Sequence, residues 1–180
     1  MIHQIETPVY TLGSRPSFDD YFLFLAFAVA LRSDDLFVKH GAVLVSDKSK
    51  HIIGTGYNGS IRKMSDEILQ PTDRNARRGL MIHAEANCLA NTTQNPLDVA
   101  YQTTIYVTGE PCLNCLQSII NHGVTRIVCA DRNGSLAESE ETKLLKQQII
   151  DLYRDQNIQV VTIPKTNIWV EKGLALLSTN

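Results

Sequence analysis

The sequence predicts an α/β protein in which a mixed five-stranded sheet is packed between two layers of helices. Two observations predict this fold. Two short apolar runs joined by a polar turn indicate a β-hairpin in the first third of the chain. After it, short apolar segments alternate with helix-like segments, which is typical of a three-layer α/β/α sandwich. A chain of 180 residues suits one such domain, which we place at residues 17–180, after an irregular N-terminal arm at residues 1–16.

The first elements are a helix and the hairpin. Ser17 can cap the helix, and Asp20 follows three residues later in the manner of a capping box. This helix is expected to continue to about Arg32 and to be well buried, because its middle is apolar nearly all round. The hairpin strands are expected at Ala42–Ser46 and His51–Gly56, on either side of a charged four-residue turn.

A long polar stretch, residues 60–80, follows the hairpin and contains no cysteine or histidine. Beyond it, strands and helices alternate. Pro111 stands where a helix can begin, since proline is favoured in the first turn. The remaining helices are expected at residues 83–90, 111–121 and 138–155, and the remaining strands at residues 103–108, 126–130 and 158–163.

The composition excludes several classes of protein. The chain has 17 basic and 19 acidic residues and a formal net charge of −2, without the basic stripe of proteins that hold long nucleic acid. Its longest apolar run, residues 21–31, is too short to span a membrane. Residues 1–16 lack a signal-peptide pattern, and four cysteines in a chain of this length do not indicate a disulfide scaffold. We therefore expect a cytoplasmic protein that acts on a small molecule.

Two motifs together provide the ligands of a catalytic zinc site. One contains His83, and the other contains Cys112 and Cys115. Cysteines three apart at a helix start can direct both sulfurs at one point, and the positive end of the helix favours their thiolates. Zinc accepts two thiolates and one imidazole while a fourth position holds water. Each motif alone has another interpretation, a redox pair or a structural histidine, but their combination is typical of zinc nucleobase deaminases.

Glu85 is predicted to be the catalytic acid and base. It lies two residues after His83, and positions i and i+2 of a helix face different directions, so both side chains are not expected to bind one ion. A zinc-activated hydroxide would add to the carbon that bears the amine. Glu85 would deliver the proton of the water to the ring nitrogen and would then protonate the amine, which leaves as ammonia. Cys88 and Cys129 lie in apolar runs and are expected to be buried.

Several stretches resemble the deoxycytidylate (dCMP) deaminase family of the cytidine deaminase-like superfamily. They are Asp19–Ser33, Gly41–Ser60, Ile82–Ala90 and Tyr106–Ala130, and the GYNGS segment at residues 56–60 is the part most specific to dCMP deaminases. The resemblance implies the cytidine deaminase-like fold and one catalytic Zn²⁺ per chain. It also implies hydrolysis of dCMP to dUMP and ammonia, which supplies dUMP for thymidylate synthesis.

The same resemblance implies substrate contacts, assembly and regulation. Asn58 is expected to hydrogen-bond the nucleoside, although Asn58-Gly59 can also be a simple tight turn, and Ala84 is expected to contact the substrate. A homohexamer is expected, with dCTP or dTTP as effectors and Mg²⁺ accompanying the triphosphate. Two positions depart from the family pattern. Ile61 stands in place of the usual proline after GYNGS, and His40 stands where valine is common, either touching a phosphate or filling space.

A monophosphate substrate needs cations to bind it, and the residues around the matching stretches offer several. Charged loop residues are more often simply solvated, so both interpretations stay open for each of them. The candidates for phosphate or effector contacts are Lys39, Tyr57, Gly59, Arg62, Lys63, Arg74, Arg77 and Arg78.

Two alternative functions use the same motifs. A tRNA adenosine deaminase shares the zinc ligands and the glutamate, but the slightly acidic composition and the lack of a basic C-terminal helix count against it. A non-catalytic zinc or nucleotide-binding module would have no need of Glu85.

Overall fold

A mixed five-stranded sheet forms the centre of the molecule. The computed structural model describes residues 15–62, 79–92, 102–132, 138–154 and 158–178. The strand order is β2-β1-β5-β6-β7, in which β1 pairs antiparallel with β2 and β5, whereas β5, β6 and β7 run parallel. The predicted mixed sheet is therefore confirmed. Its strands are β1 (Gly41–Ser46), β2 (Ile52–Tyr57), β5 (Thr103–Val107), β6 (Arg126–Ala130) and β7 (Gln159–Ile163).

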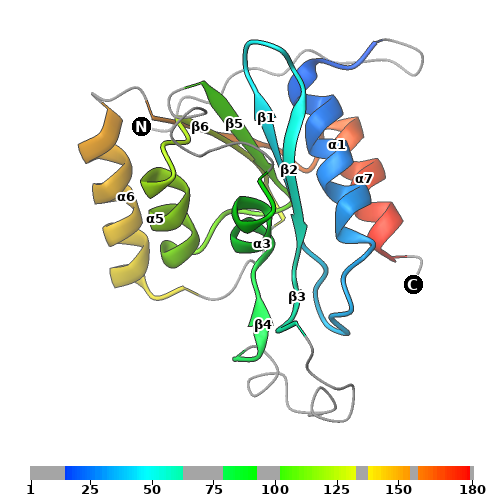
Figure 1. The fold of residues 1–180 in the computed structure, drawn as a ribbon, viewed down its shortest axis with the longest axis horizontal. Coiled ribbons are helices and arrows are strands. Elements are labelled where there is room, and N and C mark those ends of the chain that lie inside the picture. Colours follow the sequence, from blue (N-terminus) through cyan, green and yellow to red (C-terminus); the bar gives the residue numbers. More distant parts are fainter. Residues whose placement is uncertain (1–14, 63–78, 93–101, 133–137, 155–157, 179–180) are drawn as a thin grey trace.

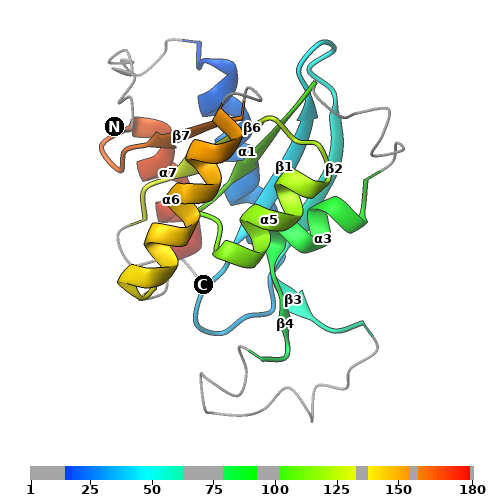
Figure 2. The ribbon, with the colours of Figure 1, turned by 90° about the vertical axis from the view of Figure 1, so that its left-hand side faces the viewer.

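Helices cover both faces of this sheet, as the three-layer prediction requires (Figures 1 and 2). Helices α1 (Phe18–Ala30) and α7 (Ile168–Ser178) lie together on one face, while α3 (Ala84–Ala90), α5 (Leu113–Asn121) and α6 (Glu140–Arg154) lie on the other. Two hydrophobic clusters fill the two spaces between the layers, because alternate residues of each strand point to opposite faces. In β5, for example, Ile105 belongs to one cluster and Tyr106 to the other.

Helix α1 is fixed at its N-terminus in the way that the sequence predicts. The Ser17 hydroxyl accepts a hydrogen bond from the backbone N–H of Asp20 at 3.1 Å and donates one to its carboxylate at 2.5 Å. The neighbouring Asp19 forms a bidentate pair with Arg126 of β6 at 2.7 and 2.8 Å and accepts a bond from Tyr106. Burial raises the pKa of Asp19, but the Arg126 hydrogen bonds outweigh it and hold that pKa below its usual value. The ion pair thus ties α1 to the sheet.

Helix α7 was not predicted from the sequence. Asn167 caps it, since its side-chain oxygen accepts bonds from the backbone N–H groups of Trp169 and Val170, and its amide donates to Asp20 at 2.8 Å. A single asparagine after a strand is a weak sequence signal for a helix start. The helix is held mainly by packing on α1, where Gly173 lies directly against Phe27.

A second, two-stranded sheet extends from the body of the molecule (Figure 2). In it β3 (Gly59–Ser60) pairs antiparallel with β4 (Met81–Ile82). The tight turn that is one interpretation of Asn58-Gly59 does not form, because the chain continues from β2 into β3. The pairing brings β4 beside β3, and α3 begins two residues after β4 ends.

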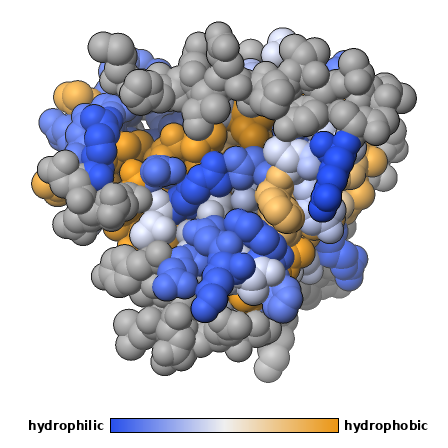
Figure 3. All heavy atoms as spheres, turned by 90° about the horizontal axis from the view of Figure 1, so that it is seen from above, coloured by the Kyte–Doolittle hydropathy of each residue, from blue (hydrophilic) through white to orange (hydrophobic). Residues whose placement is uncertain are grey.

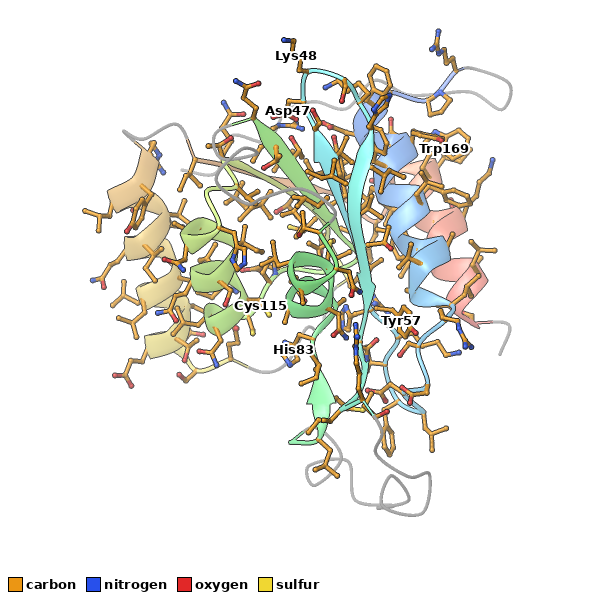
Figure 4. All side chains as sticks on the ribbon, viewed as in Figure 1. Asp47, Lys48, Tyr57, His83, Cys115 and Trp169 are labelled. Carbon is orange, nitrogen blue, oxygen red and sulfur yellow. The ribbon has the colours of Figure 1, made fainter. Side chains whose placement is uncertain are left out.

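The described residues enclose an apolar interior. Within the described ranges, none of the helices has both the length and the apolar composition needed to cross a bilayer. Figure 3 looks onto the end of the molecule that carries the turn between β1 and β2, where hydrophilic residues occupy much of the surface among smaller hydrophobic areas. Asp47 and Lys48 lie at this end, away from His83 and Cys115 (Figure 4).

Helix α3 approaches β2 so closely that two glycines are required. A Cβ atom on Gly56 would lie 2.2 Å from the Cys88 nitrogen and 2.4 Å from the Ala84 oxygen, and one on Gly54 would lie 2.9 Å from the Cys88 oxygen. These atoms belong to the helix backbone and have no rotamer through which to move away. The two glycines are alternate residues of one strand, so they face the helix from the same side of the sheet.

We predict that Gly56→Ala lowers the free energy of unfolding by about 3 kcal/mol or more, because α3 must shift to admit the methyl group. Gly59→Ala is the matched control, since its Cβ would meet no atom nearer than 3.5 Å. Urea denaturation of both variants measures the difference. Equal stability of the two variants would contradict the assigned close approach.

Candidate metal centre and active site

The predicted zinc ligands come from the N-termini of two helices. His83 and Cys112 have extended backbones and occupy the N-cap positions of α3 and α5. Cys115 lies in the first turn of α5, three residues after Cys112. Pro111 was expected to open this helix, but it precedes the cap, and the helix proper begins at Leu113. Both helices direct their positive ends toward the same place, which favours thiolates there.

The three donor atoms are spaced as zinc ligands. His83 Nδ1 lies 3.5 Å from Cys112 Sγ and 3.4 Å from Cys115 Sγ, and all three atoms lie within 4.8 Å of one another. Tetrahedral coordination with bonds of about 2.3 Å to sulfur and about 2.0 Å to nitrogen would separate these donors by about 3.6 Å. The donor set and its spacing therefore fit a zinc ion that retains a fourth position. Figure 4 shows His83 and Cys115 close together at this end of α3 and α5.

The two sulfurs differ in their affinity for a proton. Hydrogen bonds from Cys115 and His83 lower the pKa of Cys112 to about 3, against a smaller opposing effect of burial. The hydrogen bond to Cys112, together with burial, raises the pKa of Cys115. Metal binding to such ligands releases the remaining proton, since zinc binds thiolates.

Glu85 is buried beside this centre. Its residue exposure is 6%, and its carboxyl group lies within hydrogen-bonding reach of the Cys115 sulfur. Burial raises the pKa of Glu85, while a hydrogen bond from its own backbone N–H and the charge of His83 oppose the increase. A carboxyl group with a raised pKa can both accept and donate a proton near neutral pH, as the predicted role requires.

Asn58 directly follows β2, and its side-chain amide makes hydrogen bonds through both its oxygen and its nitrogen. Its oxygen accepts from the His40 backbone N–H at 2.6 Å, and its nitrogen donates to the Val38 carbonyl at 2.8 Å and to Asp35 at 3.1 Å. With a residue exposure of 6%, it fixes the chain that leads into β1. This structural role was not foreseen from the sequence, and it leaves the predicted substrate contact untested.

His40 is the departure from the family pattern that the structure explains most fully. Its Nδ1 lies 3.3 Å from Thr108 Oγ1 and 3.5 Å from Arg132 Nη1. Burial and the charges of Arg132 and His83 lower the pKa of His40 to about 4, so its imidazole is neutral near pH 7. Because an arginine can only donate, Nδ1 is the accepting nitrogen, and the proton of the neutral ring belongs on Nε2.

Several of the other residues that were predicted to contact the substrate, the phosphate or an effector make hydrogen bonds within the protein. Ala84 is fully buried as the first residue of α3, where backbone N–H groups have no partner within the helix. The Tyr57 carbonyl accepts from Asn87, and Gly59 pairs with Ile82 in β3. Arg62 donates to Asn91 at the end of α3, and the Lys39 carbonyl accepts from Arg132. The remaining candidates, Lys63, Arg74, Arg77 and Arg78, lie outside the described residues.

A buried lysine holds the segment that leads to Cys112. Lys146 of α6 has a side-chain exposure of 7% and pairs with Glu110 at 2.6 Å and with Glu138 at 2.9 Å. Burial lowers the pKa of Lys146, but hydrogen bonds to the two carboxylates outweigh this effect and raise it. Because Glu110 lies two residues before Cys112, the ion pair between Lys146 and Glu110 links α6 to the position of a predicted metal ligand.

Comparisons with known proteins agree with this geometry. The family model described as "Cytidine and deoxycytidylate deaminase zinc-binding region" matches residues 16–131. The deoxycytidylate deaminase of Mycobacterium phage D29 is 39% identical over 127 residues, covering 64% of this chain and 95% of that protein. The deoxycytidylate deaminase of Homo sapiens is 34% identical over 133 residues, covering 70% of this chain and 72% of its own length.

Solved structures show the same fold. The dCMP deaminase from the cyanophage S-TIM5, in a complex with dCMP and dUMP, superposes with a TM-score of 0.59 and 19% identity. The match covers 83% of this chain and 99% of the phage chain. RibD of Acinetobacter baumannii superposes with a TM-score of 0.55 and 22% identity. This match covers 89% of the present chain and 38% of the RibD chain. The predicted cytidine deaminase-like fold is confirmed.

We predict that Lys146→Met weakens zinc binding by about tenfold, because loss of the ion pair frees the segment at Glu110. Competition with a chromogenic chelator measures the zinc affinity without requiring turnover. Lys143→Met is the matched control, since Lys143 is exposed on the same helix and pairs with Glu140, and Lys146→Arg should preserve the affinity. Unchanged zinc binding in Lys146→Met would contradict the assigned role.

Proposed function

Because the chain belongs to the cytidine and deoxycytidylate deaminase zinc-binding family, we propose that it hydrolyses dCMP to dUMP and ammonia. The observation that carries the proposal is the convergence of His83, Cys112 and Cys115 on one point with the buried Glu85 beside it. Relatives named deoxycytidylate deaminase, in a phage and in mammals, support dCMP as the substrate.

The residues divide the chemistry between them. When bound by the three ligands, zinc supplies a water molecule of lowered pKa and an electrophilic centre. Glu85 is the residue that would take a proton from that water, since burial raises the pKa of its carboxyl group. It would deliver this proton to the ring nitrogen beside the attacked carbon. As the carbonyl of the product forms, Glu85 would take the proton of the added hydroxyl and pass it to the amine, which leaves as ammonia.

Asn58 and Ala84 are proposed to orient the nucleoside. The first backbone N–H groups of α3 have no intrahelical partner, so that of Ala84 can donate to an oxygen of the base. Asn58 already binds three partners around His40, Val38 and Asp35. Its oxygen can accept one further bond, and a sugar hydroxyl is the proposed donor.

The proposed contacts of the phosphate and of the effectors lie just before β1, at the end of β2 and in the residues that follow β2. Lys39, Tyr57, Gly59, Arg62, Arg74, Arg77 and Arg78 remain proposed contacts of a phosphate or of a dCTP or dTTP effector with Mg²⁺. A homohexamer in the cytoplasm that supplies dUMP for thymidylate synthesis completes the proposal. It follows from the resemblance to the dCMP deaminase family.

We predict that Glu85→Gln retains zinc but loses turnover, by about 10²- to 10⁴-fold, because the amide cannot carry the proton. Ammonia release gives the rate, and atomic absorption gives the zinc content. Glu171→Gln on the exposed surface of α7 is the control and should leave both values unchanged. Normal turnover in Glu85→Gln would remove Glu85 from the mechanism.

The substrate is tested by ammonia release from dCMP, dCTP, deoxycytidine and a tRNA anticodon stem, each with and without added dCTP as effector. We expect dCMP to give the highest kcat/KM. A higher value for the tRNA stem would indicate an adenosine deaminase, and no turnover of any substrate in a zinc-loaded protein would indicate a binding module. Sedimentation of the same sample measures the oligomeric state.

A further inference from the structure

Arg132 lies at the edge of the sheet that carries the metal ligands. Strands β5 and β6 are parallel, and Val107 pairs with Cys129, so their carboxyl ends meet at this edge. The chain leaves β5 through Thr108 and Gly109 toward Cys112, and it leaves β6 through Asp131 toward Arg132. A Cβ atom on Gly109 would lie 3.5 Å from Arg132 Cδ. Ligands of open α/β sheets bind outside the carboxyl ends of such strands.

The guanidinium group of Arg132 is partly buried and is held from one side. Its Nη1 donates to the Lys39 carbonyl at 2.9 Å and lies 3.5 Å from His40 Nδ1. Burial lowers the pKa of Arg132. Throughout the described part of the chain, no Asp or Glu forms an ion pair with it, and Nε and Nη2 have no acceptor. By contrast, Arg126 at the other end of β6 has a bidentate carboxylate partner.

An arginine in this state is suited to an anion. A partly desolvated cation that has no counter-ion among the described residues is costly, and a bound anion would offset the cost. Nε and Nη2, which have no acceptor among the described residues, form one side of the planar fork that binds phosphate oxygens in a bidentate manner. The neutral His40 adds no competing positive charge, and its Nδ1 helps to hold the fork in place.

His40 also connects Arg132 to both parts of the proposed site. Its backbone N–H donates to Asn58, and its Nδ1 faces the Arg132 guanidinium, so its backbone and its ring join these two residues. The charge of His83 also acts on its ring and helps to lower its pKa. A nucleotide with its base at the metal centre and its sugar near Asn58 would carry its phosphate farther along the same edge. We propose that Arg132 binds the 5′-phosphate of the nucleotide and makes the site prefer nucleotides over nucleosides.

This inference rests on the proposed deamination of dCMP, and its test separates the two. Steady-state ammonia release is measured for Arg132→Met with dCMP and with deoxycytidine. We expect the dCMP KM to rise about 10- to 100-fold, as for a lost charge-assisted phosphate contact, while kcat/KM for deoxycytidine changes less than about twofold. Arg154→Met is the matched control, because Arg154 is an exposed arginine that pairs only with Asp151 among the described residues.

Inorganic phosphate provides a second readout that needs no turnover. Calorimetric titration should show phosphate binding to the wild-type protein and to Arg154→Met, and about tenfold weaker binding to Arg132→Met. Arg132→Lys should recover part of the affinity, since it keeps the charge and loses the fork. If Arg132→Met does not fold, as judged by zinc content and thermal melting, Arg132→Gln takes its place.

The outcomes distinguish the two proposals. Wild-type turnover of dCMP, with equal effects of Arg132→Met on dCMP and deoxycytidine or with no effect on either, overturns the role of Arg132 and leaves the proposed function intact. Failure of the wild-type protein to deaminate dCMP overturns the proposed function. In that case phosphate binding that depends on Arg132 would still support an anion site, and phosphate binding that does not depend on it would overturn that site too.

Discussion

The candidate site depends on the contact between α3 and β2. Gly54 and Gly56 have no side chains, so the helix backbone rests directly on the strand, and any Cβ atom at Gly56 would overlap the helix. Asn87 and Asn91 then bond the Tyr57 and Thr55 carbonyls of β2, which fixes the helix along the strand. This contact sets where α3 begins, and therefore where His83 and Glu85 lie relative to the sheet.

The N-terminus of α5, which carries Cys112 and Cys115, must reach the same position as His83. Helix α5 follows β5, and Lys146 holds the intervening Glu110 from the side of α6. The two helix N-termini provide a positive potential that stabilises thiolates, so two cysteines can serve as ligands although no lysine or arginine contacts their sulfurs among the described residues. The short segment between β5 and α5 contains Gly109. Because this residue has no side chain, it leaves space for the side chains of His40 and Arg132.

Local sequence signals predicted most of the fold and the three donor residues that the structure brings together. Alternation of strands and helices gave the three layers, and the spacing of Cys112 and Cys115 placed both sulfurs in one helix turn. Features that depend on tertiary contacts were missed. Helix α7 has a weak cap signal and is held by packing on α1, and β3 exists because β4 pairs with it. Arg132 was overlooked because it stands in a polar segment after β6, where an arginine is usually solvated, and only the parallel pairing of β5 and β6 brings it to the site.

The charge on His40 shows how these parts depend on one another. Its Nδ1 lies 3.5 Å from Arg132 Nη1, and the charge of His83 also acts on its ring, so a protonated imidazole would repel both the guanidinium group and a zinc ion held by His83. Burial lowers its pKa, and the positive charges of Arg132 and His83 lower it further, to about 4. The ring is consequently neutral at physiological pH, where it can accept a hydrogen bond from Arg132 and keep that cation available for an anion. A valine at this position, which the resemblance to the dCMP deaminase family would lead one to expect, could fill the space but could not accept that hydrogen bond, so the orientation of Arg132 depends on the histidine.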